Sequence, residues 1–235
     1  MKLFRNLRMS FIAKENIRKY LLYAIGEILL VMIGISLAFQ LDSWNENRIK
    51  KNTAIDYYKN IRAQVSDDKI LLQEQIDFNR GYLSQFKYIN EVLASNDRTK
   101  IDTLSTILGN LTQYSDFDKE ASIYTSMVNS GEIKLLKNQD IVNSMRELEE
   151  FYNYLNRLEN IHYDAMMNYM VSSMNPIINF TTGEIMKPDD LYSYQFQNLI
   201  TAILQIMSEK DHAYNQALTE INSITELIGI ELNGD

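Results

Sequence analysis

The chain has two histidines, and each follows a glutamate by three residues, in Glu159-Asn-Ile-His162 and Glu209-Lys-Asp-His212. Two Glu-x-x-His motifs on two helices of a bundle, with one glutamate from each of two further helices, hold the metal pair of di-iron carboxylate proteins. Glu74 and Glu91 could supply such a glutamate. The chemistry that these residue types could perform is therefore metal binding inside a helical bundle.

Helical geometry argues against a shared metal site. With about 100° of rotation per residue, His162 falls within the apolar stripe of its helix, whereas His212 lies opposite the stripe that contains Ile203 and Met207. Because a buried metal needs both histidines to face inward, we predict no metal ligands here. We expect His162 to be a hydrogen-bonded core residue and His212 to be solvated.

Four methionines near His162 could bind a soft metal through their thioethers, but methionine is also an adaptable packing residue, and we interpret them as core. They are Met166, Met167, Met170 and Met174. The sequence contains no glycine-rich phosphate loop, no nucleophile elbow and no cysteine. We therefore expect no catalytic residue, no cofactor and no enzymatic activity.

The apolar run YLLYAIGEILLVMIGISLAF, residues 20–39, is interrupted by a single charge, Glu27. As a helix it would be about 30 Å long, the thickness of the hydrocarbon core of a bilayer. Its eleven Leu, Ile, Val and Phe residues favour insertion by roughly 0.3 to 0.6 kcal/mol each, against a cost of about 3 kcal/mol for one central carboxylate. We predict a transmembrane helix over residues 20–41, with Tyr20 and Tyr23 at one membrane interface and Trp44 at the other.

The charges around this run predict its orientation. Residues 1–19 form a basic head of net charge +5, which the positive-inside rule keeps in the cytoplasm, as a short interfacial helix or as a disordered tail. Removing the head and Glu27 from the whole chain's −8 leaves −12 for residues 40–235. The predicted extracytoplasmic part, residues 42–235, is therefore acidic, and we expect it not to bind nucleic acid. A signal peptide cleaved after Ala38 is the alternative, but the run exceeds the usual length of about 7 to 15 residues.

One face of the predicted transmembrane helix holds both a polar group and small residues. Counting by helical steps places Glu27, Gly34 and Ala38 on this face. Gly34 and Ala38 form a small-xxx-small pair that lets another helix approach closely, and an ionisable group at such depth is a functional hypothesis. Three interpretations stay open: copies of the helix associate around Glu27, Glu27 lines a proton or ion path, or Glu27 is idle.

The block YLLYAIGEILLVMIGISLAFQLDSWNE, residues 20–46, resembles a family of single-span bacterial membrane proteins classed as a domain of unknown function. A weaker resemblance continues through YTSMVNSGEIKLL, residues 124–136. The resemblance implies a shared membrane topology and a mostly helical outer domain, and it supplies no activity or cofactor. With the charge distribution, it predicts a protein of the bacterial inner membrane whose N-terminus is cytoplasmic and whose bulk is periplasmic.

After residue 42 the apolar residues recur at helical spacing, which predicts an all-α domain. The membrane helix would continue into it and end near residues 95–97, followed by helices at 102–113, at 118–130 with Gly131 as C-cap, at 138–173 and at 190–232, with a loop or small hairpin at 176–190. We predict a long-helix bundle of four-helix type whose first seam has a coiled-coil-like spacing. The predicted core stripes are Tyr58, Ile61, Val65, Leu72, Ile76, Leu83, Phe86 and Leu93; Ile141, Leu148, Tyr152, Leu155, His162, Met166 and Tyr169; and Phe196, Ile203, Met207, Tyr214, Ile221 and Ile228.

Together these features predict a single-pass membrane-anchored helical protein that acts as a self-associating scaffold or partner-binding module of the cell envelope. Its expected partners are membrane lipid, further copies of the chain in a homo-oligomer, and an envelope protein. The alternatives are an oligomeric channel or sensor that uses the Glu27 stripe, and a metal-binding helical bundle.

Overall fold

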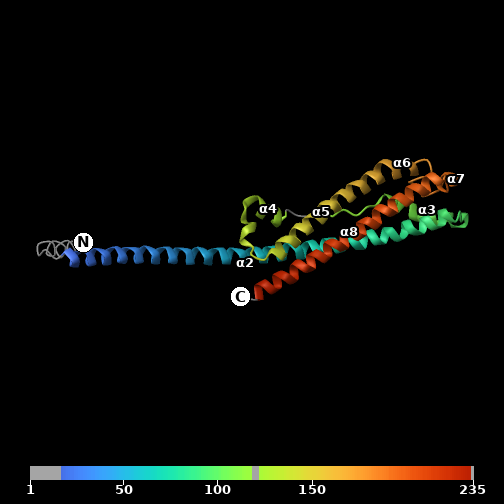
Figure 1. Ribbon diagram of the computed structural model, residues 1–235. Coiled ribbons are helices and arrows are strands. Elements are labelled where there is room, and N and C mark those ends of the chain that lie inside the picture. The colour runs from blue at the N-terminus through green and yellow to red at the C-terminus, as the bar shows by residue number, and fades with distance from the viewer. Residues whose placement is uncertain (1–16, 118–121, 234–235) are drawn as a thin grey trace. The chain divides into compact units, whose positions relative to one another are not determined.

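The structure, a computed structural model, describes residues 17–117 and 122–233, with the side chains of residues 17, 19 and 20 excepted (Figure 1). The chain divides into two compact units, residues 1–54 and residues 55–235. No strand occurs in the described part of the chain, where one isolated antiparallel bridge pairs Ile178 with Ile185. The predicted all-α fold is confirmed, whereas the predicted basic head lies almost wholly outside the described residues.

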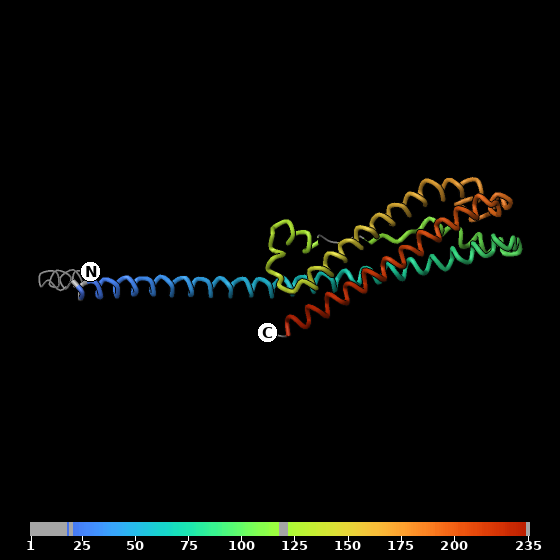
Figure 2. Tube along the Cα trace, viewed as in Figure 1, coloured from blue at the N-terminus to red at the C-terminus, as the bar shows by residue number. Residues whose placement is uncertain are grey.

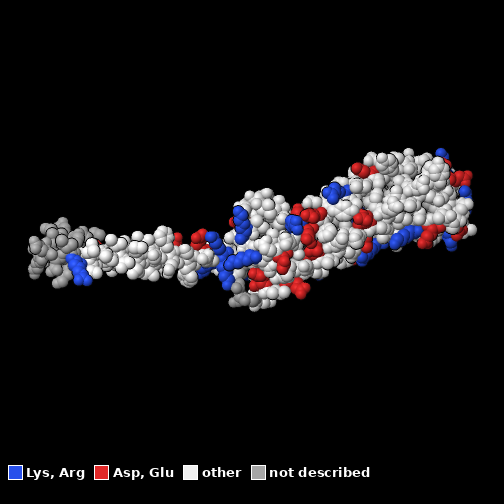
Figure 3. Space-filling view, viewed as in Figure 1, with Lys and Arg blue, Asp and Glu red and all other residues white. Residues whose placement is uncertain are grey.

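The first helix, α2, runs from Ile17 to Ala94 without interruption, and it contributes to both units. Its predicted end near residues 95–97 is therefore confirmed. In the N-terminal unit, the helix between Leu21 and Phe39 carries apolar side chains all round except at Glu27, and the face seen in Figure 3 has a long uncharged surface along this helix. This stretch is long and apolar enough to cross a membrane, and none of its most apolar window is buried. Its large side chains therefore have no protein core to fill in this unit.

The C-terminal unit is built on three long helices, which Figures 1 and 2 show running alongside one another. They are α2 from Ile55 onward, α5 (Gln139–Asp164) and α8 (Tyr194–Asn233). A π-helical segment, η4 (Ala165–Met170), joins α5 to α6 (Val171–Met174). The shorter elements are η1 (Arg98–Lys100), α3 (Ile101–Leu108), η2 (Gly109–Thr112), α4 (Ile123–Ser130), η3 (Glu132–Leu135) and α7 (Pro188–Leu191).

Local sequence explains where these helices begin and end. The Asn138 side chain accepts hydrogen bonds from the backbone amides of Asp140 and Ile141 in the first turn of α5, and the Ser122 hydroxyl accepts one from the Thr125 amide in the first turn of α4. Gly131 has a φ of 76°, the left-handed conformation that glycine adopts freely, and it ends α4 as predicted. In the described residues this helix begins at Ile123 rather than at the predicted residue 118, and residues 118–121 lie outside the described part.

The predicted stripes of α2 and α8 are confirmed, because every residue that we assigned to them is buried. For the helix predicted at residues 138–173, the prediction that Tyr169 is buried is wrong. Its side chain is 64% exposed, and the neighbouring Met170 is buried instead. The reason is η4, since a π turn holds more residues than an α turn and moves every later side chain around the helix axis. The core is continued by Met170 at the end of η4 and by Met174 in α6.

Two hydrophobic clusters fill the C-terminal unit, one after the other along the long helices. In α8 the first cluster uses residues from Ala213 to Ile228 and the second uses residues from Phe196 to Met207. In α2 the division falls between Ile76 and Leu83, whereas α5 contributes to the first cluster and η4 and α6 contribute to the second. The buried residues between the two clusters are polar, and we call them the polar layer: Asn79, Ser115, Glu159, His162 and Lys210.

Candidate functional site

The polar layer gathers three side chains that can carry charge in a place closed to water. Glu159 and His162 come from α5, and Lys210 comes from α8; they are 3%, 0% and 0% exposed. Each stands at a position where the apolar spacing of its helix would place a hydrophobic residue. The same helical spacing that buries leucine and isoleucine elsewhere thus carries these polar groups into the core.

Glu159 is held through one of its two oxygens. Its Oε1 accepts a hydrogen bond from the Tyr214 hydroxyl at 2.5 Å and another from the Phe117 backbone amide at 2.9 Å. The Tyr214 hydroxyl also lies 3.3 Å from Ser115 Oγ. Its Oε2 is buried and has no hydrogen-bond partner within the described part of the chain.

Lys210 is bound by the backbone and by the histidine. Its Nζ donates to the Ser115 carbonyl oxygen at 2.5 Å and lies 3.4 Å from His162 Nδ1. If Nδ1 accepts from the ammonium, the ring proton of His162 is on Nε2, which is buried and has no partner among the described residues. The predicted hydrogen-bonded core role of His162 is confirmed on this one side of its ring.

Burial controls the protonation of this layer. Burial, reinforced by the nearby Lys210 charge, lowers the pKa of His162 to about 3, so the ring is neutral at pH 7. Burial also lowers the pKa of Lys210 to about 8, although Glu159 and Asp116 work against this change. For Glu159, burial raises the pKa, while the Tyr214 hydrogen bond and the Lys210 charge favour the carboxylate. Glu159 and Lys210, whose opposite charges favour each other, thus share one buried layer.

A hollow of about 220 Å³ lies against Glu159 on the outside of the layer. It is lined by Tyr114, Asp116, Asn156, Glu159, Asn160 and Tyr163. The rings of Tyr114 and Tyr163 meet edge to face, with 5.4 Å between their centroids. The polar layer therefore has an opening whose lining contains acidic, amide and aromatic side chains.

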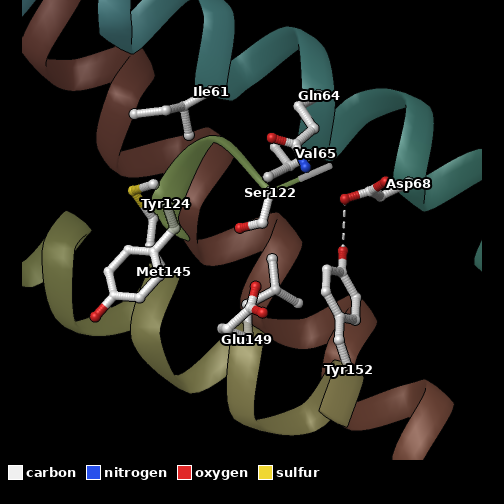
Figure 4. Close-up of a pocket in the computed structure, with 10 residues that line it drawn as sticks. Ile61, Gln64, Val65, Asp68, Ser122, Tyr124, Met145, Glu149 and Tyr152 are labelled. Atoms are coloured by element: carbon white, nitrogen blue, oxygen red, sulfur yellow. Dashed lines mark hydrogen bonds between the residues drawn. The ribbon is translucent and has the colours of Figure 1, made fainter. Parts of the chain in front are cut away.

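Two further polar contacts join the long helices. Tyr152 of α5 donates to Asp68 Oδ2 of α2 at 2.9 Å, beside a small cavity of about 20 Å³ (Figure 4). Burial, with the Asp68 charge, raises the pKa of Tyr152 and keeps its hydroxyl protonated as a donor. Three turns further along α2, Asn79 Nδ2 donates to the Met207 carbonyl oxygen of α8 at 3.0 Å. Both contacts tie α2 to its neighbours by paired polar groups.

The residues of the di-iron pattern do not come together. His162 is buried and His212 is exposed, as predicted. Glu209 is also exposed, where it accepts a hydrogen bond from the Tyr154 hydroxyl at 2.7 Å, and Glu74 and Glu91 are exposed on α2. Within the described residues, no three His, Asp or Glu side chains are placed to hold a metal ion. The four-glutamate geometry of a di-iron centre is therefore not assembled by these residues.

The predicted membrane-face residues lie in the N-terminal unit and are exposed. Nothing lies within 4 Å of a Cβ placed on Gly34, and Ala38 is equally open. Glu27 is exposed and already takes part in an interaction within the chain, as does the half-buried Tyr23. The side chain of Tyr20 lies outside the described part. Their roles in association and at the membrane interface stay predictions.

Trp44, the predicted anchor at the other membrane interface, is 64% exposed. The Arg48 guanidinium lies 5.4 Å from the centroid of its ring, within the range of a cation–π contact. An aromatic ring partnered by a cation suits the headgroup region of a bilayer, although its place there stays a prediction.

Sequence reasoning missed Lys210, Asp68 and Asn79 as buried groups. The signal was present, since Ile203, Met207, Lys210 and Tyr214 follow one another at alternating steps of four and three residues. A charged residue inside an unbroken apolar repeat is expected to be buried with its partners. The predicted stripe of the last helix included only apolar residues, and Lys210 was therefore overlooked.

Comparison with known proteins gives one match. A family model described as a family of unknown function (DUF6090) matches residues 27–208, from the carboxylate of the apolar run to α8. No curated protein and no solved structure matches the chain. The match includes Glu159 and His162, while Lys210 and Tyr214 lie just beyond its end.

Proposed function

The chain belongs to the family of unknown function DUF6090, and from this premise we propose that it is a single-pass membrane protein that self-associates through its span. In this proposal the outer bundle binds a protein partner in the cell envelope, without catalysis. The basic head lies in the cytoplasm of a bacterium, the span crosses the inner membrane, and the acidic bundle lies in the periplasm.

The observation that carries the proposal is the exposure of the apolar run. Soluble proteins rarely expose a continuous apolar surface of this kind, because water contact with it is unfavourable. Here the large side chains from Leu21 to Phe39 are exposed on every side of the helix. Lipid is the environment that satisfies a helix of this length and composition.

The open face around Gly34 supports self-association. Helices in lipid associate by close packing at small residues, since lipid tails give no hydrophobic drive. Gly34 and Ala38 are four residues apart, and the space beside Gly34 is free for a neighbouring backbone. Glu27 lies on the same face, where a second copy would bring a second carboxyl group.

Exposed tyrosines on the outer bundle support the binding of a protein partner. Tyr163, Tyr169 and Tyr194 are 45%, 64% and 70% exposed. Tyrosine is enriched in protein interfaces because a large rigid ring also carries a polar hydroxyl. These three residues are the positions where substitution should first weaken partner binding.

The test is the oligomeric state of the full-length protein in detergent, measured by crosslinking and by mass. We expect Gly34→Leu to weaken self-association by about tenfold, because a large side chain separates the backbones. Ser36→Leu, on another face of the same helix, is the matched control and should leave association unchanged. A monomeric wild-type protein, or a Gly34→Leu variant that associates as well as wild type, would contradict the proposal.

Glu27 is tested in the same assay. If the carboxyl group takes part in association, Glu27→Leu should weaken it more than Glu27→Gln, because the amide can still form hydrogen bonds between helices. Equal association of both variants and wild type would show that Glu27 has no part in assembly. Loss of an ion flux with association intact would instead favour the channel.

A further inference from the structure

Two stretches of the C-terminal unit contain no Lys, Arg, Asp or Glu. They are residues 165–183, from the start of η4 to the loop after α6, and residues 191–208, which lead into and form the first part of α8. In the whole chain 23% of the residues are charged, so stretches of 19 and 18 residues without a charge depart from the rest of the sequence. Whichever of their side chains reach the surface, that surface is uncharged.

The two stretches belong to the same part of the bundle, because both pack into the second hydrophobic cluster. The exposed sides of α5 and α8 meet where the Tyr154 hydroxyl donates to Glu209 at 2.7 Å. Helical steps back from Glu209 place Gln205, Ala202 and Asn198 on this same side of α8, and all three are exposed. Figure 3 shows a broad surface without charge around α6 and the beginning of α8. We call the exposed residues of the two stretches the uncharged surface.

The composition of the uncharged surface suits a protein interface. It exposes Met167, Tyr169, Phe180 and Tyr194 by 38%, 64%, 51% and 70%. The cores of interfaces are depleted of charged residues and enriched in tyrosine, phenylalanine and methionine. The two stretches contain 16 exposed and 10 half-buried residues. That is enough for one side of a standard interface, which takes about 20–30 residues.

Charge selects which protein fits this surface. Residues 55–235 contain 14 basic and 27 acidic residues, a net charge of −13. Two copies of this unit therefore repel each other wherever their charged surfaces meet. Where two uncharged surfaces meet, no carboxylate of either copy is taken out of water. A strongly charged partner would find no opposite charge there, whereas a second copy brings a surface of the same kind, as an isologous contact requires.

We propose that the uncharged surface binds the same surface of a second copy of the chain. This inference rests on the proposed function, since it identifies the protein partner of the outer bundle as another copy. Association through the span would hold two bundles on the same side of the membrane, where the high local concentration favours even a weak contact.

The experiment measures the dissociation constant of self-association for the full-length protein in detergent by sedimentation equilibrium. Ala202→Glu should weaken self-association at least about tenfold, because the contact would bury a charge without a partner. Asn168→Asp places a charge on the other stretch without a change in size, and it should weaken association by about threefold or more. Both residues are exposed, so the variants should keep the fold, which far-ultraviolet circular dichroism checks.

Ala63→Glu is the matched control. Ala63 is also an exposed alanine inside a long helix of the C-terminal unit, but it lies in α2 beside Arg62 and outside the uncharged surface. The variant adds the same charge to the same unit, so it should associate like wild type. A loss equal to that of Ala202→Glu would overturn the inference, because added charge alone would then explain the effect.

Gly34→Leu separates this inference from the association of the span. If Gly34→Leu weakens association and Ala202→Glu weakens it further in the double variant, both contacts are supported. If Gly34→Leu has no effect while Ala202→Glu weakens association, the proposed role of the span fails and the inference stands.

The opposite result would overturn the inference alone. If Gly34→Leu weakens association while either Ala202→Glu or Asn168→Asp associates like wild type, the span holds the copies together without the uncharged surface. That surface would then serve another occupant, such as a different envelope protein or a glycan.

Discussion

Glu27 and Lys210 each place a charged group within a hydrophobic surface, but their surroundings differ. Lys210 is fully buried, and its partners Ser115 and His162 come from other parts of the same unit. Glu27 lies in an apolar run whose side chains are exposed all round. The Lys210 ammonium thus has its partners inside the core of the C-terminal unit, whereas the apolar side chains around Glu27 have no core around them. Substitutions in the two regions should therefore affect different properties.

The largest effect is expected for Lys210→Met, which leaves Glu159 buried without a cation. The two groups interact through their charges rather than by a direct salt bridge. Leaving a buried charge without its counter-charge typically costs about 3–5 kcal/mol, so the free energy of unfolding should fall by up to this amount. Urea unfolding of the full-length protein in detergent measures it. Adding Glu159→Gln should recover part of the loss, with a coupling of about 0.5–3 kcal/mol in a double-mutant cycle. A single variant that costs less than about 0.5 kcal/mol would show that Lys210 is not the counter-charge.

The next largest effect is a difference in unfolding free energy between substitutions at two neighbouring residues of η4, Met170 and Tyr169. Met170→Ala should cost about 2–5 kcal/mol of unfolding free energy, because it empties a filled part of the core. Tyr169→Ala and, in the apolar run, Leu29→Ala should each stay within about 0.5 kcal/mol, since both side chains are exposed. The same urea unfolding assay compares the three. A costly Tyr169→Ala would mean that the helix is a regular α-helix through residues 165–170.

Per pH unit, a smaller effect is expected from acid. The pKa of His162 is lowered from 6.5 to about 3 in the folded protein. Between these two pH values the unfolded chain therefore binds a proton at His162 that the folded chain does not bind. His162 therefore stabilises the fold fully above pH 6.5, and this contribution is lost as the pH falls toward 3, by at most about 1.4 kcal/mol per pH unit. The raised pKa of Glu159 acts in the opposite direction, and the nearby charges of Lys210 and Asp116 also affect the layer.

The measurement for His162 is unfolding free energy against pH for wild type and for His162→Gln. Because Glu159 titrates in both proteins, the difference between the two slopes isolates the histidine. The wild type should lose stability more steeply between pH 6.5 and pH 4. Identical slopes would show that His162 takes up its proton without unfolding.

The smallest effect on folding is expected for Glu27→Leu. The carboxyl group belongs to the N-terminal unit, so the unfolding free energy of the outer bundle should change by less than about 0.5 kcal/mol. Near-ultraviolet circular dichroism of the bundle tyrosines during urea unfolding follows this transition. A loss comparable to that of Lys210→Met would mean that both charges serve the same fold.

The sequence predicted the long helices and most of the core because apolar spacing determines both. Ile61, Leu72 and Phe86 in α2, and Ile203 and Ile221 in α8, are buried as expected. It did not predict η4, since a π turn depends on packing around Ala165–Met170 rather than on a local signal. Nor did the spacing of apolar residues indicate the hollow beside Glu159, which arises where the segment after η2 meets α5.

The polar layer also limits how the long helices can be aligned. A repeat of hydrophobic residues alone would let α8 slide along its neighbours by seven residues with its apolar stripe still facing inward. Such a slip would move Lys210 to where Ile203 or Ala217 now packs, among purely apolar neighbours. Its ammonium would then lose the Ser115 carbonyl and the nearby carboxylates. One lysine in the middle of α8 thus selects a single register from several that hydrophobic contacts would allow.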